Sequence, residues 1–134
     1  MSAIEVLGLC KNYNRTVAVS DLNMTVPANT CFGFLGPNGA GKTTTMKMLL
    51  GLTIPTRGTA TVLGYDIIRN IGEIRERVGY LPEFAPKPNE RALNFLVMLA
   101  RVNSPYGRQA LKSQAKDALE RVGLWEVRNK KVSK

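Results

Sequence analysis

Residues 36–44 of the sequence read Gly36-Pro37-Asn38-Gly39-Ala40-Gly41-Lys42-Thr43-Thr44. This stretch fits the pattern G-x-x-x-x-G-K-[ST], which is typical of a phosphate-binding P-loop. The pattern has a physical basis, because clustered phosphate charge needs many donors, and backbone N–H groups supply them most densely where a chain curls tightly. Gly36, Gly39 and Gly41 permit such a curl, since they have no Cβ and tolerate positive φ.

The residues after the glycines predict the rest of a phosphate site. Lys42 supplies a mobile point charge for the β and γ phosphates. The hydroxyl of Thr43 is placed to ligate Mg²⁺. A helix that begins here would direct its N-terminus, the positive end of its dipole, at the bound anion.

The flanking sequence agrees with this interpretation. Residues 30–35 are apolar and predict a short buried strand, and residues 42–51 predict a helix. The apolar face of that helix is expected to hold Met46, Leu49 and Leu50. A strand, a glycine-rich loop and a helix in this order form the arrangement in which P-loops occur.

Composition places the chain among ordinary globular proteins. It has 134 residues, of which 44% are hydrophobic and 22% charged, enough for one domain with a real core. No apolar run approaches the roughly 18 residues of a membrane span. The absence of histidine excludes histidine-based acid–base catalysis and histidine metal sites. Cys10 and Cys31 lie in strand-like contexts and are expected to be buried, reduced thiols of a cytosolic protein.

The net charge is +9, which permits an anionic partner. Most Lys and Arg residues are interleaved with Asp and Glu, and only residues 128–134 form a basic run. We interpret that run as a solvated terminal segment rather than a nucleic-acid patch.

Hydrophobic patterning predicts the remaining elements. Strands are expected over residues 4–9, 16–20 and 22–26, with a turn at 11–15. Two more strands are expected over residues 59–63 and 78–81, and the strand over 59–63 would pair with the N-terminal strands. Helices are expected over residues 71–77, 90–102 and 107–122, with a further helical turn within 124–131. The helix over 107–122 has an apolar stripe of Leu111, Ala115, Ala118, Leu119 and Val122.

These residues resemble the nucleotide-binding subunit of ABC transporters. Residues 34–44 look like the Walker A motif of that family almost letter for letter, and the resemblance covers essentially the whole chain. Residues 9–13, Leu-Cys-Lys-Asn-Tyr, look like its aromatic loop, in which Tyr13 would stack on the adenine ring. Stacking of a base on an aromatic ring contributes about 1–3 kcal/mol. The alternative for Tyr13 is an ordinary surface tyrosine.

Residues 78–83, Val-Gly-Tyr-Leu-Pro-Glu, look like the family's Q-loop. That loop usually ends in Gln, which reaches Mg²⁺ and the attacking water, whereas this sequence has Glu83. The change is similar to the variant in drug and sodium exporters of the family. A carboxylate can also ligate Mg²⁺. The resemblance therefore implies that Glu83 binds the metal and that Glu83 and Lys42 both take part in catalysis. The alternative is a solvent-exposed loop glutamate.

The resemblance implies an α/β fold with a partial P-loop NTPase core, an N-terminal antiparallel β-subdomain and the start of an α-helical subdomain. The expected division is residues 1–86 and 87–134. The cofactors would be ATP and Mg²⁺, with Thr43 and Glu83 as metal ligands. The implied nucleotide-binding residues are Tyr13, Gly36, Asn38, Gly39, Ala40, Gly41, Lys42, Thr43 and Thr44.

The implied function is that of an ATP-binding, energy-coupling subunit of an exporter, peripheral on the cytoplasmic face of the cell membrane. Its partners would be a transmembrane permease subunit and a second nucleotide-binding subunit, with no nucleic acid. The family's signature motif, Walker B aspartate, catalytic glutamate and switch histidine are not in the sequence. We therefore expect an N-terminal part of the usual domain that does not hydrolyse ATP alone.

Other hypotheses remain open from the sequence. A soluble ABC-type ATPase acting on ribosomes or nucleic acid is compatible with the charge of +9. A fragment that binds nucleotide weakly or not at all is a second alternative. A small P-loop kinase fits less well, because it has no need for the tyrosine turn before the P-loop or the Tyr-Leu-Pro-Glu turn after it.

Overall fold

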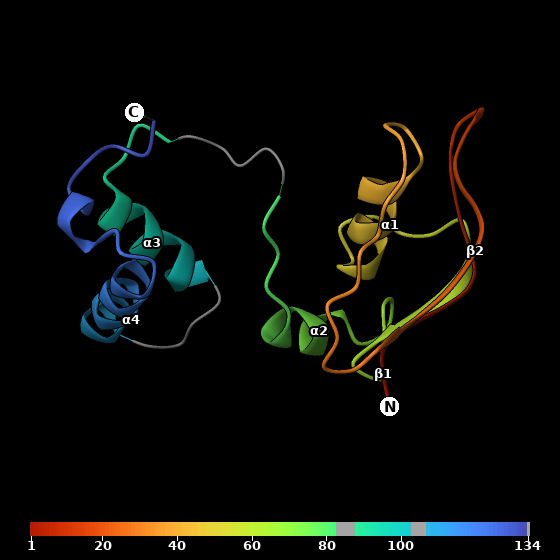
Figure 1. Cartoon of the computed structure of the whole chain (residues 1–134), viewed down its shortest axis with the longest axis horizontal. Coiled ribbons are helices and arrows are strands. Elements are labelled where there is room, and N and C mark those ends of the chain that lie inside the picture. Colours follow the sequence, from red (N-terminus) through yellow and green to blue (C-terminus); the bar gives the residue numbers. More distant parts are fainter. Residues whose placement is uncertain (83–87, 103–106, 134) are drawn as a thin grey trace. The chain divides into compact units, whose positions relative to one another are not determined.

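The computed structural model describes residues 1–82, 88–102 and 107–133. The chain divides into two compact units, residues 1–79 and 80–134 (Figure 1). The predicted boundary at residue 86 falls in the segment 83–87, outside the described residues, so the division into 1–86 and 87–134 stays a prediction.

The first unit contains an antiparallel sheet of four strands in the order β2-β1-β3-β4. The strands are β1 (Ser2–Tyr13), β2 (Thr16–Pro27), β3 (Arg57–Val62) and β4 (Tyr65–Asp66). β1 pairs with β2 on one side and with β3 on the other, which confirms the predicted pairing of the early strands. The two strands predicted over residues 16–20 and 22–26 form a single strand, and the predicted turn over 11–15 is confined to residues 14–15.

A register shift in β1 changes which side chains face the core. The shift lies between Val6 and Leu9, where Gly8 has a φ of 57° and donates its N–H to Asn23 Oδ1 at 2.9 Å. Residues three apart on a regular strand would face opposite sides. Because of the irregularity, Val6 and Leu9 are both buried.

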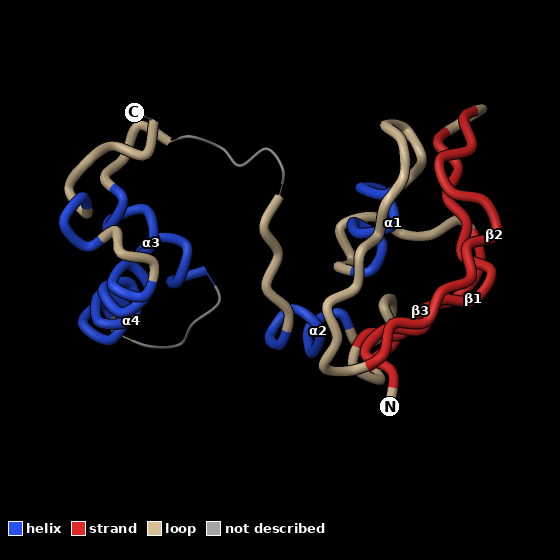
Figure 2. Tube along the Cα trace, viewed as in Figure 1, coloured by secondary structure: helices blue, strands red, loops and turns tan. Residues whose placement is uncertain are grey.

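Two helices pack against the sheet, α1 (Lys42–Leu49) and α2 (Ile71–Arg77), and Figure 2 shows them in blue beside the red strands. The hydrophobic core between these layers consists of Val6, Leu9, Val19, Met48, Leu49, Ala60, Val62, Ile67 and Ile74. The bounds of α2 agree with the prediction. This core joins side chains from three strands and both helices, so each helix depends on the sheet for its apolar contacts.

The buried face of α1 differs from the predicted one. Thr45, Met48 and Leu49 are buried, whereas Met46 is 44% exposed and Leu50 is half-buried. The buried residues follow the i, i+3, i+4 spacing of one helical face, and Met46 lies off that face.

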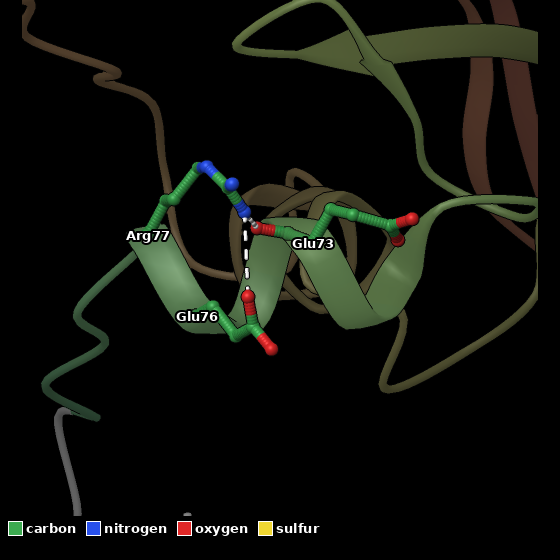
Figure 3. A network of polar contacts seen from close by, with 3 residues as sticks. All are labelled: Glu73, Glu76 and Arg77. Carbon is green, nitrogen blue, oxygen red and sulfur yellow. Dashed lines mark hydrogen bonds and ion pairs between the residues drawn. The ribbon is translucent and has the colours of Figure 1, made fainter.

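Arginines of α2 satisfy carbonyl groups at two helix ends. Arg75 donates to the carbonyl oxygens of Leu50 at 3.4 Å and Gly51 at 3.0 Å, just after α1. Arg77 donates from Nη1 to the Glu73 carbonyl oxygen at 2.7 Å and lies 3.5 Å from Glu76 Oε2 (Figure 3). Both arginines place positive charge at the C-terminal end of a helix, where the dipole favours it.

The two predicted strands over residues 30–35 and 78–81 are absent among the described residues. Phe32 is 47% exposed, Leu35 90% and Leu81 89%. An extended apolar segment becomes a strand only when a neighbour pairs with its backbone groups, and none of the four strands pairs with either segment. Cys31 is consequently exposed, contrary to the prediction, whereas Cys10 is buried; both are free thiols.

The second unit contains α3 (Ala92–Val102), α4 (Arg108–Arg121) and the short 3₁₀ helix η1 (Trp125–Val127). α3 begins two residues later than predicted, because Arg91 forms a β-bridge with Lys131. The Glu90 carboxylate accepts from the Arg91 N–H at 2.8 Å and from Asn94 Nδ2 at 3.1 Å. These contacts hold residues 90 and 91 in a non-helical approach to α3.

The apolar stripe of α4 is narrower than predicted. Leu111, Ala115 and Leu119 are buried, while Ala118 is exposed and Val122 is 65% exposed. The three buried residues recur every four positions and form one line along the helix.

None of the described helices is long and apolar enough to cross a membrane.

Trp125 packs against two basic side chains of the second unit. Arg128 lies 4.4 Å and Lys116 5.5 Å from the centre of its indole ring, within the range of cation–π attraction. Arg128 also donates to the Trp125 carbonyl oxygen at 2.9 Å. Arg128, at the start of the 128–134 run, therefore packs on Trp125, whereas Lys130 and Lys131 of the same run are exposed, in line with the interpretation of a solvated segment.

The Asp66 carboxylate generates a prediction about pH. Its Oδ1 accepts from the N–H groups of Arg69 at 2.9 Å and Ile68 at 2.8 Å, and these hydrogen bonds lower the pKa of Asp66. A lowered folded-state pKa stabilises the fold above the ordinary aspartate pKa of about 4, and this stabilisation is lost as pH falls through the folded value. We expect Asp66→Asn, which keeps an acceptor but not the charge, to lower the melting temperature at neutral pH.

The deficit of Asp66→Asn should shrink as pH falls below the ordinary aspartate pKa and through the lower folded-state pKa, because the wild-type carboxyl then also becomes protonated. Thermal unfolding followed by circular dichroism at a series of pH values measures it. Asp117→Asn, the same charge change on an exposed residue of α4, is the control. A deficit independent of pH would show that the charge of Asp66 contributes nothing.

Candidate nucleotide-binding site

The predicted P-loop lies between β2 and α1, in the first unit. Gly41 is the N-cap residue of α1 and has a φ of 84°, as does Gly39. This is the left-handed region that only glycine enters freely. Gly36 is not among the residues with positive φ, so the tight curl depends on the second and third glycines of the motif.

Gly41 lies against β2 so closely that no side chain fits there. A Cβ at Gly41 would collide with the carbonyl oxygen of Ala18 and lie 2.9 Å from Val19 Cγ2. At Gly39, by contrast, a Cβ would meet no atom within 4 Å, so one side of the loop touches the sheet and another is open. The contact of Ala18 and Val19 with this loop could not be predicted from the sequence, because apolar strand residues give no signal of it.

Lys42 folds back over the loop that precedes it. Its Nζ donates to the carbonyl oxygens of Gly36 and Pro37, both at 2.6 Å, and the Ala40 N–H donates to the Pro37 oxygen at 3.2 Å. No carboxylate forms an ion pair with Lys42 within the described part of the chain. The ammonium group thus lies next to the carbonyl groups at the start of the loop, and no described side chain neutralises its charge.

Backbone donors converge at the start of α1. Thr45 donates its N–H to the Gly41 carbonyl oxygen at 2.8 Å, which begins the helical hydrogen bonds. Among described residues, no hydrogen bond is made by the N–H groups of Gly39 and of the four residues 41–44. Thr43 is exposed and Thr44 half-buried, and Asn38 and Ala40 are exposed. Unpaired N–H groups at a helix N-terminus, next to a lysine, form a site suited to a phosphate group.

Tyr13 lies at the same end of the sheet as the P-loop. It pairs with Thr16 of β2, and Ala18, whose carbonyl oxygen touches Gly41, is two residues further along that strand. Because two residues of a strand span about 7 Å, Thr16 and Ala18 lie about that far apart along β2. The ring of Tyr13 is accessible, since the residue is 46% exposed, and Lys11 Nζ lies 4.8 Å from its centre.

The other predicted ligand, Glu83, lies outside the described residues, so its catalytic and Mg²⁺ roles stay predictions. The described residues contain no group of three or more His, Cys, Asp and Glu side chains that could hold a metal ion by themselves. The hydroxyl of Thr43 is a hard oxygen donor of the kind that Mg²⁺ accepts. Thr43 would therefore supply one of the several oxygen ligands that such an ion takes.

Comparisons with known proteins identify relatives of this chain. The family model described as ABC transporter matches residues 19–134. The daunorubicin/doxorubicin resistance ATP-binding protein DrrA of Streptomyces peucetius is 37% identical over 129 residues, which are 96% of this chain and 39% of that protein. The Nod factor export ATP-binding protein I of Cupriavidus pinatubonensis is 48% identical over 81 residues, 60% of this chain and 25% of that protein.

Solved structures show the same fold at lower identity. MJ1267, an ATP-binding cassette of an ABC transporter in its ADP conformation, matches with a TM-score of 0.76 and 16% identity over 100% of this chain and 59% of its own. CbiO1 from Clostridium perfringens matches with a TM-score of 0.72 and 22% identity over 97% of this chain and 54% of its own. The predicted α/β class, a partial P-loop NTPase fold with an N-terminal antiparallel sheet, is thereby confirmed.

The chain spans about two fifths of the length of DrrA and less than two thirds of either solved cassette. The family model nevertheless covers residues 19–134, which include the whole P-loop and the helices α3, α4 and η1 of the second unit. The chain therefore belongs to the ABC transporter family.

Proposed function

We propose that this chain is the nucleotide-binding part of an ATP-driven, energy-coupling subunit of an ABC-type membrane exporter. The observation that carries the proposal is the P-loop, in which Lys42 folds over the carbonyl groups of Gly36 and Pro37 in front of the N-terminus of α1. The names of DrrA, a drug resistance protein, and of the Nod factor export protein support export as the direction. They do not favour a soluble ATPase acting on ribosomes or nucleic acid.

The described residues suggest how ATP would bind. Its phosphates would lie over the N–H groups of Gly39 and residues 41–44, which make no hydrogen bond among the described residues. Lys42 would then exchange its two carbonyl partners for phosphate oxygens, which attract its charge more strongly. The Thr43 hydroxyl would hold Mg²⁺, which supplies positive charge beside the phosphates, and Tyr13 would stack on adenine.

The parent protein would couple ATP hydrolysis to transport, with a permease subunit and a second nucleotide-binding subunit as partners at the cytoplasmic face of the membrane. ATP would bind the closed state of such an assembly more tightly than the open one, and this difference in affinity would drive the closure. We propose that the 134-residue chain alone binds ATP without hydrolysing it. Lys42 can stabilise charge on the phosphates, but hydrolysis also needs a group that orients the attacking water.

The first test concerns Lys42. Loss of a charged hydrogen-bonding partner amounts to about 1.5–3 kcal/mol, so Lys42→Ala should raise the Kd for ATP–Mg²⁺ roughly 10- to 100-fold. Isothermal titration calorimetry measures the change. Lys47→Ala removes the same charge from the last turn of α1 and should leave the Kd within about twofold, since surface charges act weakly at a distance. Equal effects of the two substitutions would contradict the proposed site.

The second test concerns Tyr13. If its ring stacks on adenine, Tyr13→Ala should weaken ATP binding by about 5- to 150-fold and leave the affinity for tripolyphosphate unchanged. Tyr13→Phe keeps the ring and should bind ATP like the wild type. Titration of all three proteins with both ligands separates base from phosphate contacts. A parallel loss of tripolyphosphate binding in Tyr13→Ala would mean that the ring supports the loop and not the base.

A further inference from the structure

A groove runs between α3 and α4 in the second unit, with a volume of about 700 Å³. Figure 1 shows these two helices side by side, in teal and blue. Apolar side chains of both helices line it, namely Val97, Met98 and Leu111. Leu111 is buried, whereas Met98 is 54% exposed and its neighbour Leu99 47% exposed. The apolar lining therefore continues onto the open surface of α3.

Among the described residues, the charged ones that line the groove are all cations. Arg101 comes from α3, and Arg108 and Lys112 come from α4. Within the described parts of the unit, none of the three forms an ion pair with a carboxylate. Three unneutralised cations around one concavity attract an anion.

The charge of the whole unit has the same sign. Residues 80–134 include eleven Lys and Arg against five Asp and Glu, a net charge of +6 out of the +9 of the chain. An anionic surface would therefore orient this unit toward itself before any specific contact forms.

The lining fits an anionic amphiphile better than a peptide. Guanidinium groups such as those of Arg101 and Arg108 match phosphate oxygens in pairs, and the apolar floor suits the start of an acyl chain. A peptide backbone needs neutral polar partners, but Asn94, which also lines the groove, already donates to Glu90 at 3.1 Å. The volume of about 700 Å³ is in the range of sites for single small molecules.

We propose that this groove binds the headgroup phosphate of an anionic phospholipid, with Arg101, Arg108 and Lys112 as its ligands. Met98 and Leu99 would then contact the acyl boundary next to it. The helical unit would thus have an affinity for an anionic membrane surface that needs no permease. This inference goes beyond the proposed function and does not depend on nucleotide binding.

Co-sedimentation with vesicles tests the proposal. The full chain is incubated with vesicles of phosphatidylcholine alone or with an equal part of phosphatidylglycerol. Binding is expected only with phosphatidylglycerol, and the triple variant R101Q/R108Q/K112Q should lower the partition coefficient on the order of 100-fold. Each single variant should lower it about fivefold, which keeps the test decisive if the triple variant does not fold by circular dichroism.

The matched control is R121Q/K130Q/K131Q, which removes three cations of the same unit that do not line the groove. The decrease in the partition coefficient of this control should be at least tenfold smaller than that of the groove variant, since charge outside the site acts only at long range. Equal losses would overturn the proposal in favour of diffuse attraction, and no binding of the wild type would overturn it outright. Two further results would also overturn the proposal. One is release of the bound protein from vesicles by millimolar inorganic phosphate. The other is binding of an acidic helical peptide that depends on the groove residues, with no binding to vesicles.

Discussion

The contact between Gly41 and β2 is the constraint on which the candidate site depends. At this point a loop and a strand approach until only a hydrogen atom fits between them, because a Cβ on Gly41 would collide with the Ala18 carbonyl oxygen. The contact fixes where α1 begins, and hence where its first N–H groups lie. Lys42 follows at once, so its ammonium group is directed back over the loop. A phosphate site built from backbone groups needs this rigidity, since it has few side chains to adjust.

The hydrophobic core holds that contact in place. Val19 lies beside Gly41 and also belongs to the core, where it joins Met48 and Leu49 of α1. The same packing that stabilises the sheet and the helix therefore sets the distance between the P-loop and β2. Tyr13 depends on it indirectly, because the pairing of β1 with β2 places it at this end of the sheet. In the proposed binding mode, both ends of ATP would be held by one structural unit.

The sequence predicted those features whose cause is local. The glycine spacing indicated the P-loop and α1, and helical periodicity gave the bounds of α2. Features that depend on a distant neighbour were missed. Residues 30–35 and 78–81 have strand-like composition, but composition does not say whether a partner strand lies beside them, and among described residues none does. The contact of Ala18 with Gly41 is likewise invisible in sequence, since it is a backbone contact.

The most direct test of this account compares Gly41→Ala with Gly39→Ala by urea denaturation. Both glycines have a φ of 84°, so both substitutions strain the backbone by a similar amount, about 1–2 kcal/mol. Only Gly41→Ala also meets β2, while Gly39 faces open space. The account predicts that Gly41→Ala lowers the free energy of unfolding by at least about 1 kcal/mol more than Gly39→Ala. Equal losses would contradict the claim that the sheet positions the P-loop.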